Sequence, residues 1–111
     1  MKNVIFRYEY RDAANYHKSN QVVFSSNSKL DLAVIDAEIR KHLFDDEYFY
    51  PDKLFIPEIE MFDFDPQCDH FWYTYLKIEF TIDPPTDKRT FQEFLSDLEK
   101  FARKTPDFLC K

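Results

Sequence analysis

The sequence predicts an α+β fold, in which about four mainly antiparallel strands carry two helices on one face in the order β-β-α-β-β-α. Three observations lead to this prediction. Two segments repeat apolar residues at helical spacing, and several others alternate apolar and polar residues as strands do. The 111 residues are 44% hydrophobic and 19% aromatic, which suffices for the core of one two-layer domain spanning residues 1–111.

The first two strands are predicted near residues 3–10 and 21–26. NVIFRYEY alternates, with Val4, Phe6 and Tyr8 on one side, and QVVFSS supplies the partner strand. The polar stretch RDAANYHKSN between them is too long for a tight hairpin turn, so an ordered loop is expected there.

A helix is predicted near residues 29–43. Leu32, Ile35 and Ile39 recur at three and four residues and form one apolar face. Asn27 or Ser28 is expected to cap its N-terminus.

Two further strands are predicted near residues 56–62 and 71–82. In LFIPEIEMF, apolar and acidic residues alternate after Pro57, which places this strand at a sheet edge or delays its start. FWYTYLKIEFTI is the longest alternating run, and its even-numbered residues are expected to face the core, although its first half is apolar on both sides.

The last helix is predicted near residues 90–103, because Thr90 and Glu93 have the spacing of a capping box. The large apolar side chains on the inward faces of all these elements are expected to be buried. They are Phe6, Tyr8, Val22, Phe24, Leu32, Ile35, Ile39, Leu43, Trp72, Leu76, Ile78, Phe80, Phe94, Leu95 and Leu98.

The chain contains no glycine, and this absence excludes several nucleotide-binding motifs. The P-loop, the dinucleotide fingerprint and the kinase loop all need glycine for positive φ and close backbone approach. Left-handed positions must therefore use Asn or Asp, and Asn15, Asn20 and Asn27 are the candidates.

The segment FDFDPQCDHFWY is the candidate metal or acid/base site. Asp63 and Asp65 resemble the start of a calcium loop, but Cys68 and Thr74 stand where that loop needs Gly and Glu. Cys68, Asp69 and His70 are adjacent, and three adjacent side chains in extended backbone cannot all point to one transition metal. A small metal-dependent or acid/base enzyme using Asp63, Asp65 and His70 is therefore only the alternative hypothesis, and no cofactor is expected.

Charge is distributed unevenly along the chain. Residues 45–69 hold nine acids and one base, so this quarter carries a charge of −8 and leaves +2 for the remainder, given the net charge of −6. Aromatic residues are interleaved with these acids, a combination that protein interfaces use for anchoring and steering. The alternative to a binding surface is a loop that the acids keep soluble, with its aromatic side chains turned toward the core. The expected binding residues are Asp45, Asp46, Glu47, Tyr48, Tyr50, Asp63, Asp65 and Asp69.

The expected partner is a basic protein. The chain would act on it either as an inhibitor or immunity-type protein, or as an acidic decoy that resembles the charge of a nucleic acid. Direct nucleic-acid binding is not expected, because the net charge is negative. Membrane insertion is not expected either, since no apolar run approaches 18 residues.

A cytoplasmic location is expected, because the N-terminus lacks the apolar core of a signal peptide and the chain has two cysteines. A disulfide between Cys68 and Cys110 in an exported protein stays open as an alternative. The segments RYEYRDA, DEYFYPDK and DHFWY resemble a group of small bacterial proteins to which no activity is attached. This resemblance implies a bacterial cytosolic setting.

Overall fold

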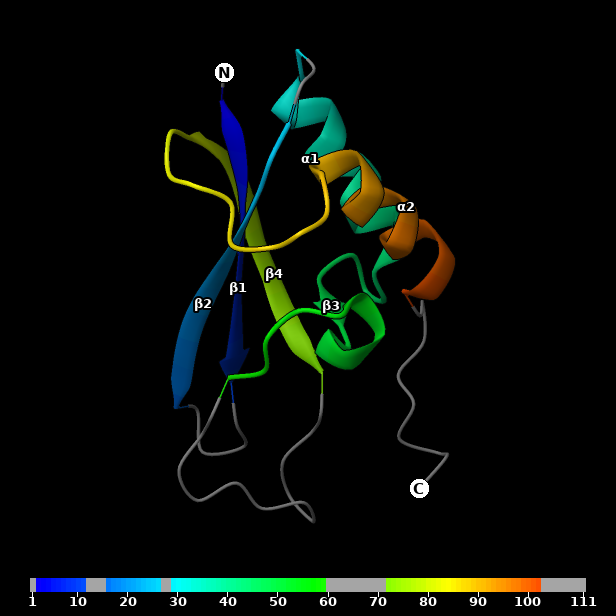
Figure 1. Ribbon diagram of the computed structural model, residues 1–111. Helices are drawn as coiled ribbons and strands as arrows, with labels where there is room; N and C mark the ends of the chain where they lie inside the picture. The colour runs from blue at the N-terminus through cyan, green and yellow to red at the C-terminus, as the bar shows by residue number, and fades with distance from the viewer. Residues whose placement is uncertain (1, 12–15, 27–28, 60–71, 103–111) are drawn as a thin grey trace.

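Figure 1 shows the computed structural model, which describes residues 2–11, 16–26, 29–59 and 72–102. One four-stranded antiparallel sheet has the strand order β2-β1-β4-β3 and carries two α-helices. The elements are β1 (Asn3–Arg11), β2 (His17–Phe24), α1 (Leu32–His42), β3 (Tyr48–Phe49), the 3-10 helix η1 (Pro51–Leu54), β4 (Tyr73–Thr81) and α2 (Phe91–Phe101). The predicted α+β class is confirmed.

Strand β1 lies at the centre of the sheet. Its Val4 is opposite Phe24 of β2 on one side and Phe80 of β4 on the other. β2 begins at His17, which is opposite Arg11, so it starts earlier than the predicted residue 21. Its first five residues are polar and exposed, so they show no alternation of apolar and polar residues. Only their backbone pairing with β1 makes them part of the strand.

Both helices begin at side-chain caps. Asp31 Oδ1 accepts hydrogen bonds from the amides of Ala33 (3.1 Å) and Val34 (3.4 Å), so Asp31 caps α1. The prediction that Asn27 or Ser28 caps this helix is therefore wrong, because α1 begins only at Leu32; the two residues themselves lie outside the described residues. The capping box predicted for α2 is present, because Thr90 and Glu93 each accept a hydrogen bond from the other's amide.

Aromatic side chains dominate the core between the sheet and the helices. The ring of Phe94 on α2 lies 4.4 Å from that of Phe24 and 4.9 Å from that of Phe6. Such pairs contribute beyond the area that they bury. Nine predicted core residues are buried: Phe6, Tyr8, Val22, Phe24, Ile39, Leu43, Ile78, Phe94 and Leu98. Leu32, Ile35, Trp72 and Leu95 are half-buried.

The strand predicted near 56–62 is wrong over its described part, because Ile56–Ile59 form no strand. Tyrosine hydroxyls hold this segment instead. Tyr8 Oη donates to the carbonyl of Pro57 (2.6 Å), and the amide of Ile59 donates to Tyr73 Oη (2.7 Å). The fourth strand of the sheet is the two-residue β3, which is too short to produce an alternating pattern.

The predicted inward face of β4 is also wrong in its first half. The register with β1 shifts so that Arg7 is opposite Lys77 but Tyr8 is opposite Tyr75, and Leu76 is the extra residue of a β-bulge. The bulge reverses the side-chain alternation, so Tyr73 and Tyr75 enter the core. Leu76 and Phe80, expected to be buried, are 36% and 39% exposed.

The other face of the sheet is partly covered by the connection between β4 and α2, which crosses it in yellow in Figure 1. Val23 donates its amide to Thr86 Oγ1 (2.9 Å), and its carbonyl accepts from the amides of Thr86 and Asp87. Ile5 and Val23 are buried on this face. Within the described part of the chain, no helix has the length and apolar character needed to cross a membrane.

Candidate partner-binding surface

The centre of the acidic region is a tight turn between α1 and β3. Asp45 and Asp46 have φ values of 53° and 59°, in the left-handed region, and Phe44 accepts hydrogen bonds from the amides of Glu47 and Tyr48. Asp tolerates this conformation better than most other residues except glycine. All three acids of the turn are exposed. The expectation that asparagine would fill such positions is wrong for Asn20, which lies in β2; Asn15 and Asn27 lie outside the described residues.

Arg40, in the last turn of α1, ties this turn to the rest of the molecule. Its Nη1 donates to the carbonyl of Asp46 (3.0 Å), Nη2 to the carbonyl of Leu76 (3.4 Å), and Nε to Asp36 Oδ2 (3.2 Å). The guanidinium also lies 4.8 Å from the centre of the Tyr75 ring. A single side chain therefore connects the acidic turn, α1 and the bulge of β4.

Tyr75 provides a second connection on the same side of the sheet. Its hydroxyl donates to Asp36 Oδ1 (2.6 Å), and its amide donates to the carbonyl of Glu47 (2.7 Å). Burial, together with the Asp36 carboxylate, raises the pKa of Tyr75 far above its usual range. The hydroxyl therefore remains a hydrogen-bond donor, and the backbone of the acidic turn is held in place at Asp46 and Glu47.

Four aromatic rings form a cluster beside the turn. The ring of Phe44 is buried, and its centre lies 5.3 Å from that of Tyr48, 5.8 Å from Tyr50 and 5.5 Å from Trp72. Tyr48, Tyr50 and Trp72 are half-buried, so each presents part of its side chain to solvent. We call the acidic-aromatic surface the set Asp45, Asp46, Glu47, Tyr48, Tyr50 and Trp72.

The acids of this surface act electrostatically on the neighbouring tyrosine. Partial burial raises the pKa of Tyr48, and the charges of Glu47 and Asp45 raise it further. The carboxylates therefore create a negative potential where the aromatic side chains meet solvent. The cations near this surface include Arg40, which binds the turn and also pairs with Asp36, and Arg11, whose charge partly opposes the rise in the pKa of Tyr48.

The structure brings together five of the predicted binding residues, from Asp45 to Tyr50. The others, Asp63, Asp65 and Asp69, lie outside the described residues, as do His70 and Cys68 of the alternative metal hypothesis. Among residues that are described, no group of three or more His, Cys, Asp or Glu side chains is placed to hold a metal ion. The sequence analysis did not place Phe44, Trp72 or Arg40 at this surface. For Arg40 a signal was available, because Asp36 and Arg40 have the i, i+4 spacing of a helical ion pair.

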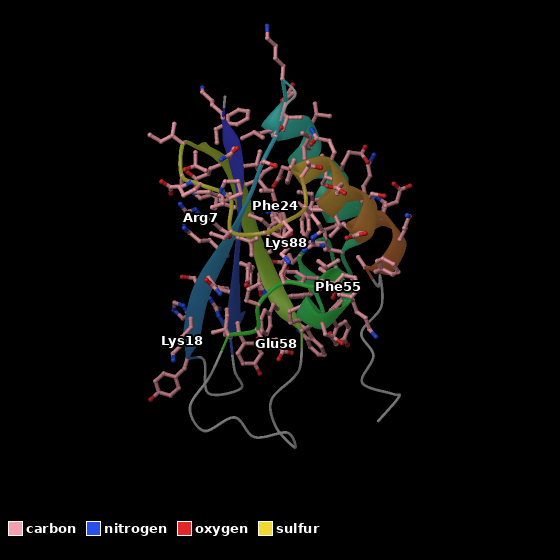
Figure 2. All side chains as sticks on the ribbon, in the orientation of Figure 1. Arg7, Lys18, Phe24, Phe55, Glu58 and Lys88 are labelled. Carbon is pink, nitrogen blue, oxygen red and sulfur yellow. The ribbon has the colours of Figure 1, made fainter. Side chains whose placement is uncertain are left out.

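Basic residues on the open face of the sheet are paired with carboxylates. Arg7 Nε lies 2.6 Å from Glu79 Oε1, and Lys77 Nζ lies 3.4 Å from the same oxygen. Hydrogen bonding from Arg7 lowers the pKa of Glu79. Figure 2 labels Arg7 on β1. The described part of this face therefore alternates in charge and does not form the uniformly basic strip typical of nucleic-acid binding.

A hollow lies between η1 and the end of α2. It has a volume of about 540 Å³ and is lined by Asp52, Lys53, Phe55, Lys100, Phe101 and Ala102. Phe55, labelled in Figure 2, is 64% exposed and has a φ of 55°. The prediction that left-handed positions use only Asn or Asp is therefore wrong at Phe55, although it holds for Asp45 and Asp46. The titratable side chains of this lining are Asp52, Lys53 and Lys100.

Comparisons with protein-family models, curated proteins and solved structures found no significant match to this chain. Its function must therefore be argued from its own residues.

Proposed function

We propose that this chain is a non-catalytic protein of the bacterial cytosol that binds a basic protein through its acidic-aromatic surface. Asp63, Asp65 and Asp69 are expected to extend that surface. The partner would be a basic enzyme that this chain blocks as an inhibitor or immunity-type protein. Alternatively, the partner would be a nucleic-acid-binding protein that this chain captures as an acidic decoy. The observation that carries the proposal is the exposed Asp45–Glu47 turn, held rigidly beside half-buried aromatic rings.

Rigidity matters because binding costs free energy when side chains and loops must be ordered. The backbone at Asp46 and Glu47 is bound to Arg40 and Tyr75, so little of the turn needs ordering when a partner arrives. Aromatic side chains such as Tyr48 and Trp72 have few rotatable bonds and bury a large area, and they are enriched among the residues that dominate interfaces.

The acids would chiefly accelerate encounter. Opposite charges increase association rates, and this increase weakens with salt because the Debye length is about 10 Å at 0.1 M ionic strength. The aromatic contacts would instead determine how slowly the complex dissociates. The surface therefore predicts separable effects on the two rate constants.

The proposal is tested by capturing proteins from a bacterial lysate on the immobilised chain and measuring binding of each purified candidate by surface plasmon resonance. The charge variant is Asp45→Asn with Glu47→Gln, because Asn also tolerates the left-handed conformation of Asp45. We expect a several-fold slower association at low salt and an unchanged thermal midpoint. The aromatic variant Tyr50→Ala should mainly accelerate dissociation.

The matched control is Glu38→Gln with Glu99→Gln, which removes the same charge from exposed positions on the two helices. This control should leave the association rate close to that of the unmodified chain. Binding that responds neither to salt nor to the charge variant would contradict the proposal and direct attention to residues 7–18 instead.

A further inference from the structure

Beyond its bulge, strand β4 has an outer edge without a backbone partner among the described residues. On this side, β3 pairs only with Tyr73 and Thr74, and the carbonyl of Glu47 accepts from Tyr75. Arg40 binds the carbonyl of Leu76. In the described part of the chain, no strand is paired with β4 on this side after that point.

The sheet register shows which backbone groups this edge presents. Val23 directs its amide and carbonyl away from β1, toward Thr86, so the opposite residue Ile5 directs its own groups toward β4. Ile5 is opposite Glu79, which therefore bonds to β1. Since direction alternates along a strand, the amides and carbonyls of Ile78 and Phe80 point to the free edge.

Two apolar side chains near the C-terminal end of this edge are exposed. Phe80 is 39% exposed and Ile82 is 89% exposed, while Lys2 Nζ lies 5.4 Å from the centre of the Phe80 ring. In Figure 1 the C-terminal end of β4 diverges from α1, so the helix does not cover it. Natural sheets usually protect an exposed edge with charged side chains, proline, a β-bulge or a covering element. Strand β4 has a bulge and Lys77 at the start of this edge, whereas Phe80 and Ile82 beyond them are apolar and exposed. An open edge with apolar side chains is therefore a surface for strand addition.

We propose that a second copy of this chain adds its own β4 to this edge, antiparallel and about a twofold axis at Phe80. An isologous contact of this kind needs a surface that complements itself. With the axis at Phe80, the two Phe80 side chains are opposite each other and Ile78 is opposite Ile82 of the partner subunit. On the other face, Lys77 is opposite Asp83 of the partner subunit.

Charge selects this register over its neighbour. An axis at Glu79 would place two Glu79 carboxylates directly opposite each other, and like charges in opposite positions destabilise a strand pair. The axis at Phe80 instead provides two Lys77–Asp83 pairs by symmetry. The Asp83 side chain is exposed, while its backbone is held by Asn3 Nδ2 (2.8 Å) and Thr81 Oγ1 (3.0 Å). Self-complementarity is what favours a second copy as the occupant.

This dimer does not depend on the proposed function, because the acidic-aromatic surface lies at the other end of β4, beside Tyr73 and β3. Pairing of the two edges would join the two sheets into one. Each dimer would then display two acidic-aromatic surfaces, so a partner with two basic patches would bind with increased avidity.

Sedimentation velocity over a wide range of concentrations tests the proposal. The unmodified chain is expected to shift from monomer to dimer as concentration rises. Ile82→Lys should abolish the dimer without lowering the thermal midpoint, because this side chain is almost fully exposed in the monomer. Val34→Lys, at an exposed position of α1 away from the edge, is the matched control and should leave the dimer intact.

The register is tested by exchange of charges. Lys77→Asp and Asp83→Lys should each weaken the dimer by roughly tenfold, since each affects two cross-strand pairs. The variant with both substitutions should restore it. A chain that stays monomeric at millimolar concentration would overturn the proposal, even if a strand from another protein binds the edge. A dimer that ignores Ile82→Lys, or a double variant that fails to recover, would overturn it as well.

Discussion

Arg40 and Arg89 have the same role in two regions of different exposure. Arg40 donates to the carbonyl of Asp46, and Arg89 Nη2 donates to that of Phe55 (3.2 Å). Both accepting residues have positive φ, 59° and 55° respectively. In a chain without glycine, left-handed residues are strained, and here a hydrogen bond from an arginine outside the turn stabilises each segment that contains them.

The two regions differ in burial and in the number of carboxylates that the arginine binds. The Arg89 side chain is 16% exposed, compared with 34% for Arg40. Arg89 binds Asp87 (2.8 Å), Asp97 of α2 (3.0 Å) and the carbonyl of Leu54 (2.9 Å), besides that of Phe55. Its guanidinium also lies 5.2 Å from the centre of the Phe94 ring. We therefore expect Arg89 to support the whole fold and Arg40 to support mainly the acidic turn.

The largest effect is expected for Arg89→Met. This change leaves two partly buried carboxylates without their cation, and should lower the free energy of unfolding by about 3 kcal/mol. Arg89→Lys should recover only part of the loss, because lysine lacks the planar fork. Urea denaturation measures both. A loss no greater than that for Arg40→Met would contradict the comparison.

Arg40→Met should cost less, about 1–2 kcal/mol, because its site is more exposed and its partners are mainly carbonyls. The informative measurement is hydrogen exchange. The amides of Glu47 and Tyr48, which bond to Phe44, should exchange faster, while that of Phe94 in α2 should change little. Equal acceleration at both places would mean that Arg40 stabilises the whole fold.

The loss of stability as the pH falls below 4 should come partly from protonation of Asp87. Burial opposes its ionisation, but hydrogen bonds from the Arg89 side chain and amide outweigh that effect, and the pKa of Asp87 is lowered. Because the folded pKa lies below the unfolded value of about 3.9, this group stabilises the fold above that pH. The contribution is lost as pH falls through the folded pKa. The difference in urea midpoint between the unmodified chain and Asp87→Asn should therefore shrink from pH 6 to pH 2.

The smallest effects are expected at Asp46. Asp46→Gly relieves the left-handed strain but increases the entropy of the unfolded chain, so stability should change by less than about 0.5 kcal/mol. Asp46→Ala keeps the strain and loses the tolerance of Asp for this conformation, at a cost of about 1 kcal/mol. Thermal midpoints of the pair measure the difference. If the alanine variant were the more stable, strain at this turn would be excluded.

The helices and the α+β class were predictable from sequence because their periodicity is unambiguous. The inward face of β4 was not, because Phe71 to Tyr75 is apolar on both sides and a bulge at Leu76 has no sequence signature. The segment 56–59 alternates like a strand, yet bonds to the Tyr8 and Tyr73 hydroxyls compete with pairing. No local pattern encodes those distant contacts.

For the candidate surface, composition identified the acids and the neighbouring tyrosines. It did not show that Asp45 and Asp46 would be left-handed, because that conformation depends on tertiary contacts such as the Arg40 fork. Trp72 was assigned to the core from its place in the alternating strand. Its contact with the Phe44 ring could not be predicted, because it depends on the turn that brings the end of α1 next to β4.

The central position of β1 has a consequence for synthesis on the ribosome. Asn3 and its hydrogen-bond partner Asp83 are separated by 80 residues, so the nascent chain cannot complete the sheet until β4 emerges. At ~5–20 residues per second, this delay amounts to roughly 4–16 s. During that time β1 is itself an edge strand, with Val4 and Phe6 uncovered. The newly made chain is therefore most prone to aggregate through its central strand, which the finished fold pairs with a neighbouring strand on each side.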